Sequence, residues 1–326
     1  MDQLSAHLDR GWDLAQRGDA AGASACARRA LELDPQSPEV HNLLGYTAAL
    51  LGETDEALDH YRQAIALDET YFEAMLNAAE VLIPLGDWDE AVSLCDDALD
   101  LAETDEEACD SLLLKVDALL AKGDDDAARV ALKRIPSGPY VNPSHSFLVG
   151  RAHYELGDMK SALPFLEDAV KRDGENPDAH YYLGLLKDEE GEAHRATESF
   201  LRARQLDALR PPPPWSPKPD TFGTMVENAI LKLDVLLARY VREAQIYCVD
   251  LPGAELVVDG VDPRVSLLID AAEDKKQVRV FVYQRNVERT AGSLAEMEAE
   301  IGRSLEREVT TVFGNVPNET DKRHLN

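Results

Sequence analysis

The chain of 326 residues has little that would place it in or across a membrane. It contains no apolar run of about 18 residues, which is the length that a membrane-spanning helix needs. Its first residues, MDQLSAHLDRGW, do not combine a basic start with an apolar core, so the sequence predicts no secretion signal. We therefore expect a cytoplasmic protein that does not act at a membrane.

Cysteine is scarce, and so are the motifs of enzymes. The four cysteines (Cys26, Cys95, Cys109 and Cys248) are scattered without a CxxC pair, which favours free buried thiols over a disulfide framework. The chain has no glycine-rich phosphate loop and no nucleophile elbow, and the histidines of its first 210 residues occur singly. These absences predict a protein that is not an enzyme and that carries no cofactor and no metal.

Positive charge is the third shortage. The formal net charge is −29, and residues 1–210 hold 43 acidic against 19 basic side chains. Such a surface repels phosphate groups, so we expect no nucleic acid partner and a preference for a basic protein. A local role is the alternative for the pairs Asp55-Glu56, Asp89-Glu90 and Asp125-Asp126, because carboxylates that open a helix stabilise its positive end by about 0.3–1 kcal/mol.

What the chain does contain is a ladder of similar stretches. Each begins with glycine and reaches alanine five residues later: GDAAGA at 18–23, GETDEA at 52–57, GDWDEA at 86–91, GDDDAA at 123–128, GDMKSA at 157–162 and GEAHRA at 191–196. Their glycines follow one another at intervals of 34, 34, 37, 34 and 34 residues. A fixed period in this range indicates stacked repeats that cannot bury an apolar face alone.

Residues around each glycine recur at helical intervals. In the second unit these are His41, Leu44, Gly45 and Ala48 before Gly52, and Ala57, Tyr61 and Ala64 after it. Small residues at fixed positions allow two antiparallel helices to approach closely. The pattern resembles the tetratricopeptide repeat. The resemblance implies an all-α solenoid of six helix-turn-helix repeats over residues 4–210, with units at 4–37, 38–71, 72–105, 109–142, 143–176 and 177–210.

The resemblance also implies a binding groove. In that family the first helix of each unit lines a concave surface, and the matching positions here are Leu8, Trp12, Asn42, Tyr46, Leu76, Glu80, Phe147, Arg151, Tyr154 and Tyr181. This set is apolar and aromatic with acidic additions, which suits a basic or amphipathic protein segment. For any single aromatic residue, packing against the next repeat is the alternative.

The composition changes after the repeats. The stretch PPPPWSPKP at 211–219 predicts a stiff spacer. Beyond it we expect a helix over 220–242, strands at 245–249, 254–258, 264–269 and 277–283, and a last helix over 293–313. Together they make a small α+β domain over residues 220–317, followed by a polar tail over 318–326.

Residues 278–314 of this domain resemble the end of the small bacterial zincin-like metallopeptidases, whose final helix carries HExxHxxG. Arg307 and Thr311 stand at the two histidine positions, Glu308 and Gly314 match, and Pro317 lies near the place of the third ligand. A guanidinium group cannot ligate zinc, and a threonine hydroxyl is a poor ligand. The resemblance therefore implies a pseudoenzyme domain with a degenerate motif.

These observations lead to a non-enzymatic adaptor or regulator that binds or sequesters a basic or amphipathic protein through its repeats, with the last domain as a second docking surface. Two alternatives remain open at this point. One is a zinc metallopeptidase whose repeats select substrates, and the other is an acidic cytoplasmic chaperone of an exported protein.

Overall fold

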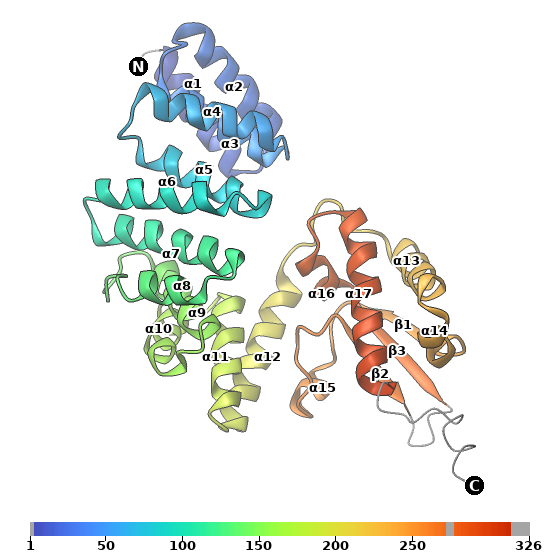
Figure 1. The fold of residues 1–326 in the computed structure, drawn as a ribbon. Helices are drawn as coiled ribbons and strands as arrows, with labels where there is room; N and C mark the ends of the chain where they lie inside the picture. Colours follow the sequence, from blue (N-terminus) through green and yellow to red (C-terminus); the bar gives the residue numbers. More distant parts are fainter. Residues whose placement is uncertain (1–2, 272–276, 314–326) are drawn as a thin grey trace. The chain divides into compact units, whose positions relative to one another are not determined.

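A computed structural model describes residues 3–271 and 277–313 (Figure 1). Gly314, Pro317 and the predicted polar tail lie outside these residues. The chain divides into two compact units, Met1–Asp173 and Gly174–Asn326, and each is described here by itself. No helix among the described residues has both the length and the apolar character needed to cross a membrane.

The first unit consists of helices that follow one another in antiparallel pairs. They are α1 (Gln3–Gln16) with α2 (Ala20–Leu33), α3 (Pro38–Leu50) with α4 (Thr54–Leu67), α5 (Phe72–Leu85) with α6 (Trp88–Leu101), α7 (Asp105–Lys122) with α8 (Asp125–Leu132), and α9 (Pro143–Glu155) with α10 (Met159–Arg172). This arrangement confirms the helix-turn-helix reading of the glycine ladder.

Each pair is joined by a turn that the ladder glycine makes possible. Gly86 and Gly123 end α5 and α7 with φ of 86° and 80°, in the left-handed region that other residues avoid. Asp124 then caps α8 by accepting a hydrogen bond from the Ala127 N–H, and Asp125-Asp126 lie in the first turn of that helix. The acidic pairs of α4 and α6 lie at the same place, which confirms the predicted position of these carboxylates at helix starts.

Close approach of the two helices depends on glycine within the first helix. A Cβ atom at Gly45 of α3 would lie 2.6 Å from the Tyr61 ring of α4, and Tyr61 is fully buried. The buried core around this pair is built largely of alanine and leucine (Ala48, Ala57, Leu58, Ala78, Ala79, Leu82 and Ala91). All four cysteines are free, as predicted, but only Cys95 and Cys109 are buried, whereas Cys26 is half-buried and Cys248 is exposed. Burial raises the pKa of the Cys95 and Cys109 thiols to about 12.

The second unit contains a sixth helix pair and a small α+β region. Its elements are α11 (Pro177–Glu189), α12 (Ala193–Leu209), α13 (Pro219–Lys232), α14 (Val235–Val241), β1 (Gln245–Val249), α15 (Ala254–Val258), β2 (Leu267–Ala271), β3 (Val278–Tyr283), α16 (Gln284–Thr290) and α17 (Leu294–Phe313). The described strands form one sheet of order β1-β3-β2, in which β1 runs parallel and β2 antiparallel to β3.

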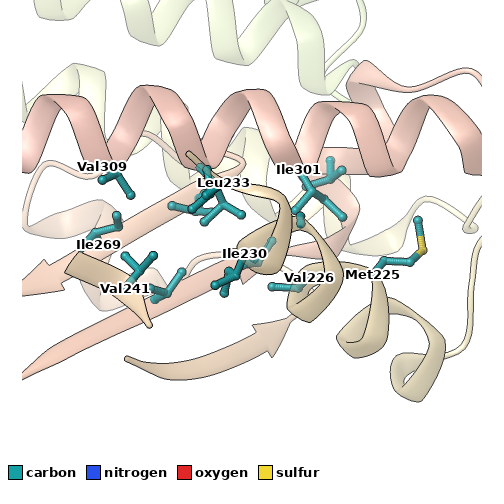
Figure 2. Close-up of a cluster of buried hydrophobic side chains, with 14 of the residues drawn as sticks. Met225, Val226, Ile230, Leu233, Val241, Ile269, Ile301 and Val309 are labelled. Carbon is teal, nitrogen blue, oxygen red and sulfur yellow. The ribbon is translucent and has the colours of Figure 1, made fainter. Parts of the chain in front are cut away.

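One apolar core fills the α+β region. Side chains of α13, α14, β2 and α17 point toward one another beneath α17, as Figure 2 shows. The core continues through Val280 and Val282 of β3, which are fully buried. Trp215 of the proline-rich segment packs against it, and the neighbouring Ser216 donates a hydrogen bond of 2.6 Å to Glu288 of α16. The segment between the sixth helix pair and α13 is thus attached to the α+β region.

Three of the predicted elements differ from the structure, and one helix of the structure was not predicted. Residues 254–258, expected as a strand, form the helix α15, which follows Pro252-Gly253 and contacts α12, so tertiary contacts override the strand propensity of its valines. The helix predicted over 220–242 ends at Lys232 and resumes as α14, where Asp234 caps it. The strand expected over 264–269 begins only at Leu267. The helix α16 was not predicted.

Candidate protein-binding face of the first helices

An aromatic pair lies on the first helices of the first unit. Trp12 of α1 and Tyr46 of α3 have ring centroids 5.2 Å apart and planes tilted by 54°. Both rings are half-buried, and Trp12 packs together with Leu8 against the core residues Val40 and Leu43. The inner edge of this pair therefore belongs to the repeat packing, while the outer edge is exposed to solvent.

A chain of hydrogen bonds connects α3 with α5. The Asn77 amide donates to the Asn42 side-chain oxygen over 3.0 Å, and the Asn42 amide donates to the Tyr71 hydroxyl over 3.2 Å. Asn42 itself is 2% exposed. It therefore positions the two helices rather than presenting a free amide to a partner, and Asn77 and Tyr71, which sequence analysis did not single out, are its partners.

Carboxylates surround these residues. Burial raises the pKa of Tyr61, and the Glu80 carboxylate and the Tyr46 hydroxyl raise it further. Burial likewise raises the pKa of Tyr71, and Glu73 and Glu39 add to this although the Asn42 hydrogen bond opposes it. All three glutamates are exposed. We call the set Trp12, Tyr46, Glu39, Glu73 and Glu80 the acidic aromatic face; Leu76 is half-buried on the same helix as Glu80.

The predicted residues of α9 have a different environment. Phe147 is buried, so its ring serves the packing of the fifth pair. Arg151 is half-buried, with its guanidinium 3.3 Å from the Asp117 carboxylate of α7 and 3.7 Å from Glu155. Tyr154 is half-buried. This part of the predicted set is engaged mainly within the first unit.

Tyr181, the remaining predicted residue, belongs to the second unit and contacts its α+β region. The Tyr181 hydroxyl donates to the Asp262 carboxylate over 3.0 Å, and the Arg264 guanidinium lies over the ring, 4.2 Å from its centroid. Residues of the α+β region thus cover much of the Tyr181 ring. No signal in the sequence connects residues 81 positions apart in this way.

An ion cluster joins the sixth helix pair to the α+β region, and sequence analysis missed it. Asp178 of α11 lies 2.8 Å from Arg264 and 2.9 Å from Arg289 of α16, and Asp207 of α12 lies 3.1 Å and 3.2 Å from the same two guanidinium groups. Burial alone would raise the pKa of Asp178, but Arg264, Arg289 and Arg210 together hold it below its ordinary value. Asp178 is therefore ionised at neutral pH.

The degenerate motif of the last helix lies on α17. Arg307 is exposed and donates to the Ser304 hydroxyl over 3.3 Å, and the exposed Thr311 donates to the Arg307 carbonyl over 2.9 Å. Glu308 is half-exposed on the same helix. Within residues 3–271 and 277–313, no three side chains of His, Cys, Asp or Glu gather where they could hold a metal ion.

Two family models match the chain, and both describe the tetratricopeptide repeat. One matches residues 8–72 and 143–211, and the other matches residues 48–116, so that together they span more than half of the chain. Neither match extends over the α+β region.

Similar proteins are longer than this chain, and the likeness covers the repeats. Human tetratricopeptide repeat protein 7B is 34% identical over 128 residues, which is 38% of this chain and 15% of that protein. The cellulose synthase operon protein C of Pseudomonas fluorescens is 28% identical over 209 residues, or 59% of this chain and 16% of that protein. The chain thus aligns with less than a fifth of the length of either relative.

Solved structures show the same fold for the repeat region. The structure of Pseudomonas aeruginosa pilF has a TM-score of 0.54 at 19% identity and covers 64% of this chain and 93% of its own. That of PilW, a type IV pilus biogenesis factor, has a TM-score of 0.52 at 20% identity and covers 63% of this chain and 93% of its own. At these identities the likeness is one of fold.

Proposed function

Because the chain belongs to the tetratricopeptide repeat family, we propose that it is a non-enzymatic adaptor that binds a basic, amphipathic segment of a protein partner on the acidic aromatic face. Proteins of this family generally mediate protein-protein interactions. The family explains why the first helices carry the contact, and the residues on those helices define which partner fits.

The observation that carries this proposal is the ring pair of Trp12 and Tyr46 on first helices that also carry the exposed carboxylates of α3 and α5. Aromatic rings offer a large and rigid apolar contact, and they attract cations over their faces. Exposed carboxylates on the same set of helices, Glu80 of α5 among them, favour Lys or Arg on the incoming segment. Glu39 and Glu73 extend the negative charge along the same two helices. A segment with apolar anchors and basic residues between them therefore complements the face.

We propose further that the α+β region is a pseudoenzyme related to the zincin-like metallopeptidases and that it serves as a second docking surface. The strand β3 precedes the long helix α17, as in this resemblance, but the short helix α16 lies between them where the resemblance has a loop. Arg307 and Thr311 occupy the positions of metal ligands in that family but cannot perform that role. Glu308 then has no metal-bound water to deprotonate.

A designed peptide tests the adaptor proposal. We expect an amphipathic helical peptide of leucine and lysine to bind the chain, and a peptide with glutamate in place of lysine not to bind. The charge reversal Glu80→Lys should weaken binding of the lysine peptide about fivefold, since exposed charge pairs contribute up to about 1 kcal/mol. Fluorescence anisotropy of the labelled peptide measures both effects.

The matched control is Glu32→Lys. Glu32 is exposed on α2, a second helix, and its reversal changes the net charge of the chain by the same amount. Binding should then weaken much less than in Glu80→Lys, at an ionic strength of about 0.1 M where screening limits the range of charge effects to about 10 Å. Equal losses in the two variants would mean that the overall charge, and not the acidic aromatic face, attracts the peptide.

A further inference from the structure

The sheet of the second unit ends in an open edge. In the order β1-β3-β2, β1 pairs with β3 on one side only, and no described strand pairs with its outer side. Along the five residues Gln245–Val249, backbone N–H and C=O groups therefore point away from the sheet. Such an edge is a template for the addition of another strand.

An apolar row crosses the sheet and ends at this edge. Tyr247 of β1 and Leu268 of β2 are both register partners of Phe281 in β3. The Tyr247 and Phe281 rings are stacked, with centroids 5.0 Å apart and planes within 15°. Alternation along the strands places these residues on the face opposite the core residues Val280 and Ile269. Tyr247 is 41% exposed, so the row is uncovered where it reaches the edge.

The strand itself lacks the features that protect an edge. Its sequence QIYCV has no charged residue and no proline, and Val249, on the same face as Tyr247, is 40% exposed. Charged residues lie instead at its two ends, where Glu243 and Asp250 are exposed. Arg242, next to Glu243, is an exposed basic residue at this end, and so is Arg279 of β3, the register partner of Gln245, which pairs with Asp270 of β2.

The helix α13 contacts β1, and Glu227 of this helix is exposed. Burial raises the pKa of the Cys248 thiol of β1, and the Glu227 carboxylate raises it further. An added strand would present one set of side chains to the apolar row and the other set to the opposite face of the sheet. Its two ends would meet Glu243 and Asp250.

A second copy of the chain fits this edge poorly. Each copy carries a formal net charge of −29, so two copies that approach at this edge repel one another. A basic segment of another protein is therefore the better complement.

We propose that the outer edge of β1 binds an extended, basic segment of a protein partner as an added strand, with an apolar side chain beside Tyr247 and Lys or Arg beside Glu243 and Asp250. This proposal rests on the proposed function in that it locates the second docking surface. Main-chain hydrogen bonds supply the affinity, and alternate side chains supply the selection.

Three peptides test the strand addition. The first alternates lysine with valine around a central tyrosine, the second has glutamate in place of lysine, and the third is the first peptide with alternate amides N-methylated. N-methylation removes the donors of one edge and keeps the charges and side chains. We expect only the first peptide to bind with an affinity that anisotropy can measure, and to slow amide exchange within residues 245–249.

The variant for the chain is Tyr247→Lys/Val249→Lys, which places two positive charges on exposed positions outside the core. We expect it to weaken binding of the first peptide by more than tenfold. The control is Val130→Lys/Val141→Lys, because these two valines of the first unit are 63% and 85% exposed and the change in charge is the same. Circular dichroism confirms that both variants are folded.

Several results would overturn the proposal. One is that the lysine peptide does not bind, and another is that its N-methylated form binds with the same affinity. A third is that Tyr247→Lys/Val249→Lys and Val130→Lys/Val141→Lys weaken binding of the lysine peptide equally. A fourth is that the wild-type chain forms a dimer that Tyr247→Lys/Val249→Lys dissociates. The last result would assign the edge to a second copy. The variant Trp12→Ala/Tyr46→Ala of the acidic aromatic face should bind the alternating lysine and valine peptide with unchanged affinity. The edge of β1 and the acidic aromatic face are therefore tested independently, and either proposal can fail while the other holds.

Discussion

Replacing Asp207 by alanine is expected to lower the free energy of unfolding of the second unit by about 3–5 kcal/mol. Asp207 is 7% exposed and lies between Arg264 and Arg289, at 3.1 Å and 3.2 Å. Without it, the Asp178 carboxylate still faces three guanidinium groups, those of Arg264, Arg289 and Arg210. Removing one partner of a buried ion pair leaves an uncompensated charge, which is far more destabilising than the pair is stabilising.

Hydrogen exchange under increasing urea measures this effect in the right place, because peptides from α12 and β3 report on the second unit alone. Glu175→Ala is the matched control in the same unit. Its partner Arg202 lies 2.6 Å away, but the Glu175 side chain is 76% exposed, so the loss should stay below about 1 kcal/mol. A loss for Asp207→Ala as small as that of the control would show that the ion cluster does not hold the sixth helix pair to the α+β region.

The double variant Trp12→Ala/Tyr46→Ala should weaken binding of the leucine and lysine peptide by about 30-fold or more. Buried aromatic anchors at the centre of an interface contribute about 2 kcal/mol or more each when truncated. The two rings lie 5.2 Å apart, so they form one contact surface and their effects need not add. Titration of the labelled peptide, followed by anisotropy, gives the ratio of dissociation constants.

Two further variants separate binding from packing, since Trp12 also contacts the core of the first repeats. Trp12→Phe/Tyr46→Phe keeps both rings and should retain the affinity within about fivefold. Trp88→Ala removes a half-buried ring from α6, a second helix, and should leave binding unchanged. An affinity that falls equally in Trp88→Ala and in Trp12→Ala/Tyr46→Ala would indicate a general loss of repeat structure and would remove the rings from the binding surface.

The repeats could be predicted from the sequence because their signals are local. The glycine that ends a first helix needs a left-handed backbone, and the small residue at Gly45 needs space for Tyr61 only 16 positions later. Both requirements recur with the period of the repeat, so each unit supports the prediction of the others. The strands β1 and β3 were found for a similar reason, from alternation within five or six residues.

What the sequence could not show depends on contacts between distant residues. The segment of α15 has the composition of a strand, and its contact with α12 favours the helical conformation instead. Of the predicted binding residues, Trp12 and Tyr46 lie together, whereas Tyr181 contacts Asp262 and Arg264 of the α+β region. The pair Asp178 and Arg289 joins residues 111 positions apart. Neither periodicity nor composition indicates which acid meets which base over such a separation.

Hydrogen exchange of the chain with and without the leucine and lysine peptide tests the central claim most directly. If the acidic aromatic face binds the peptide, protection should increase in α1, α3 and α5, over residues 3–16, 38–50 and 72–85, and should remain unchanged in α2, α4 and α6. Protection confined to the second helices, with none in the first, would contradict the account.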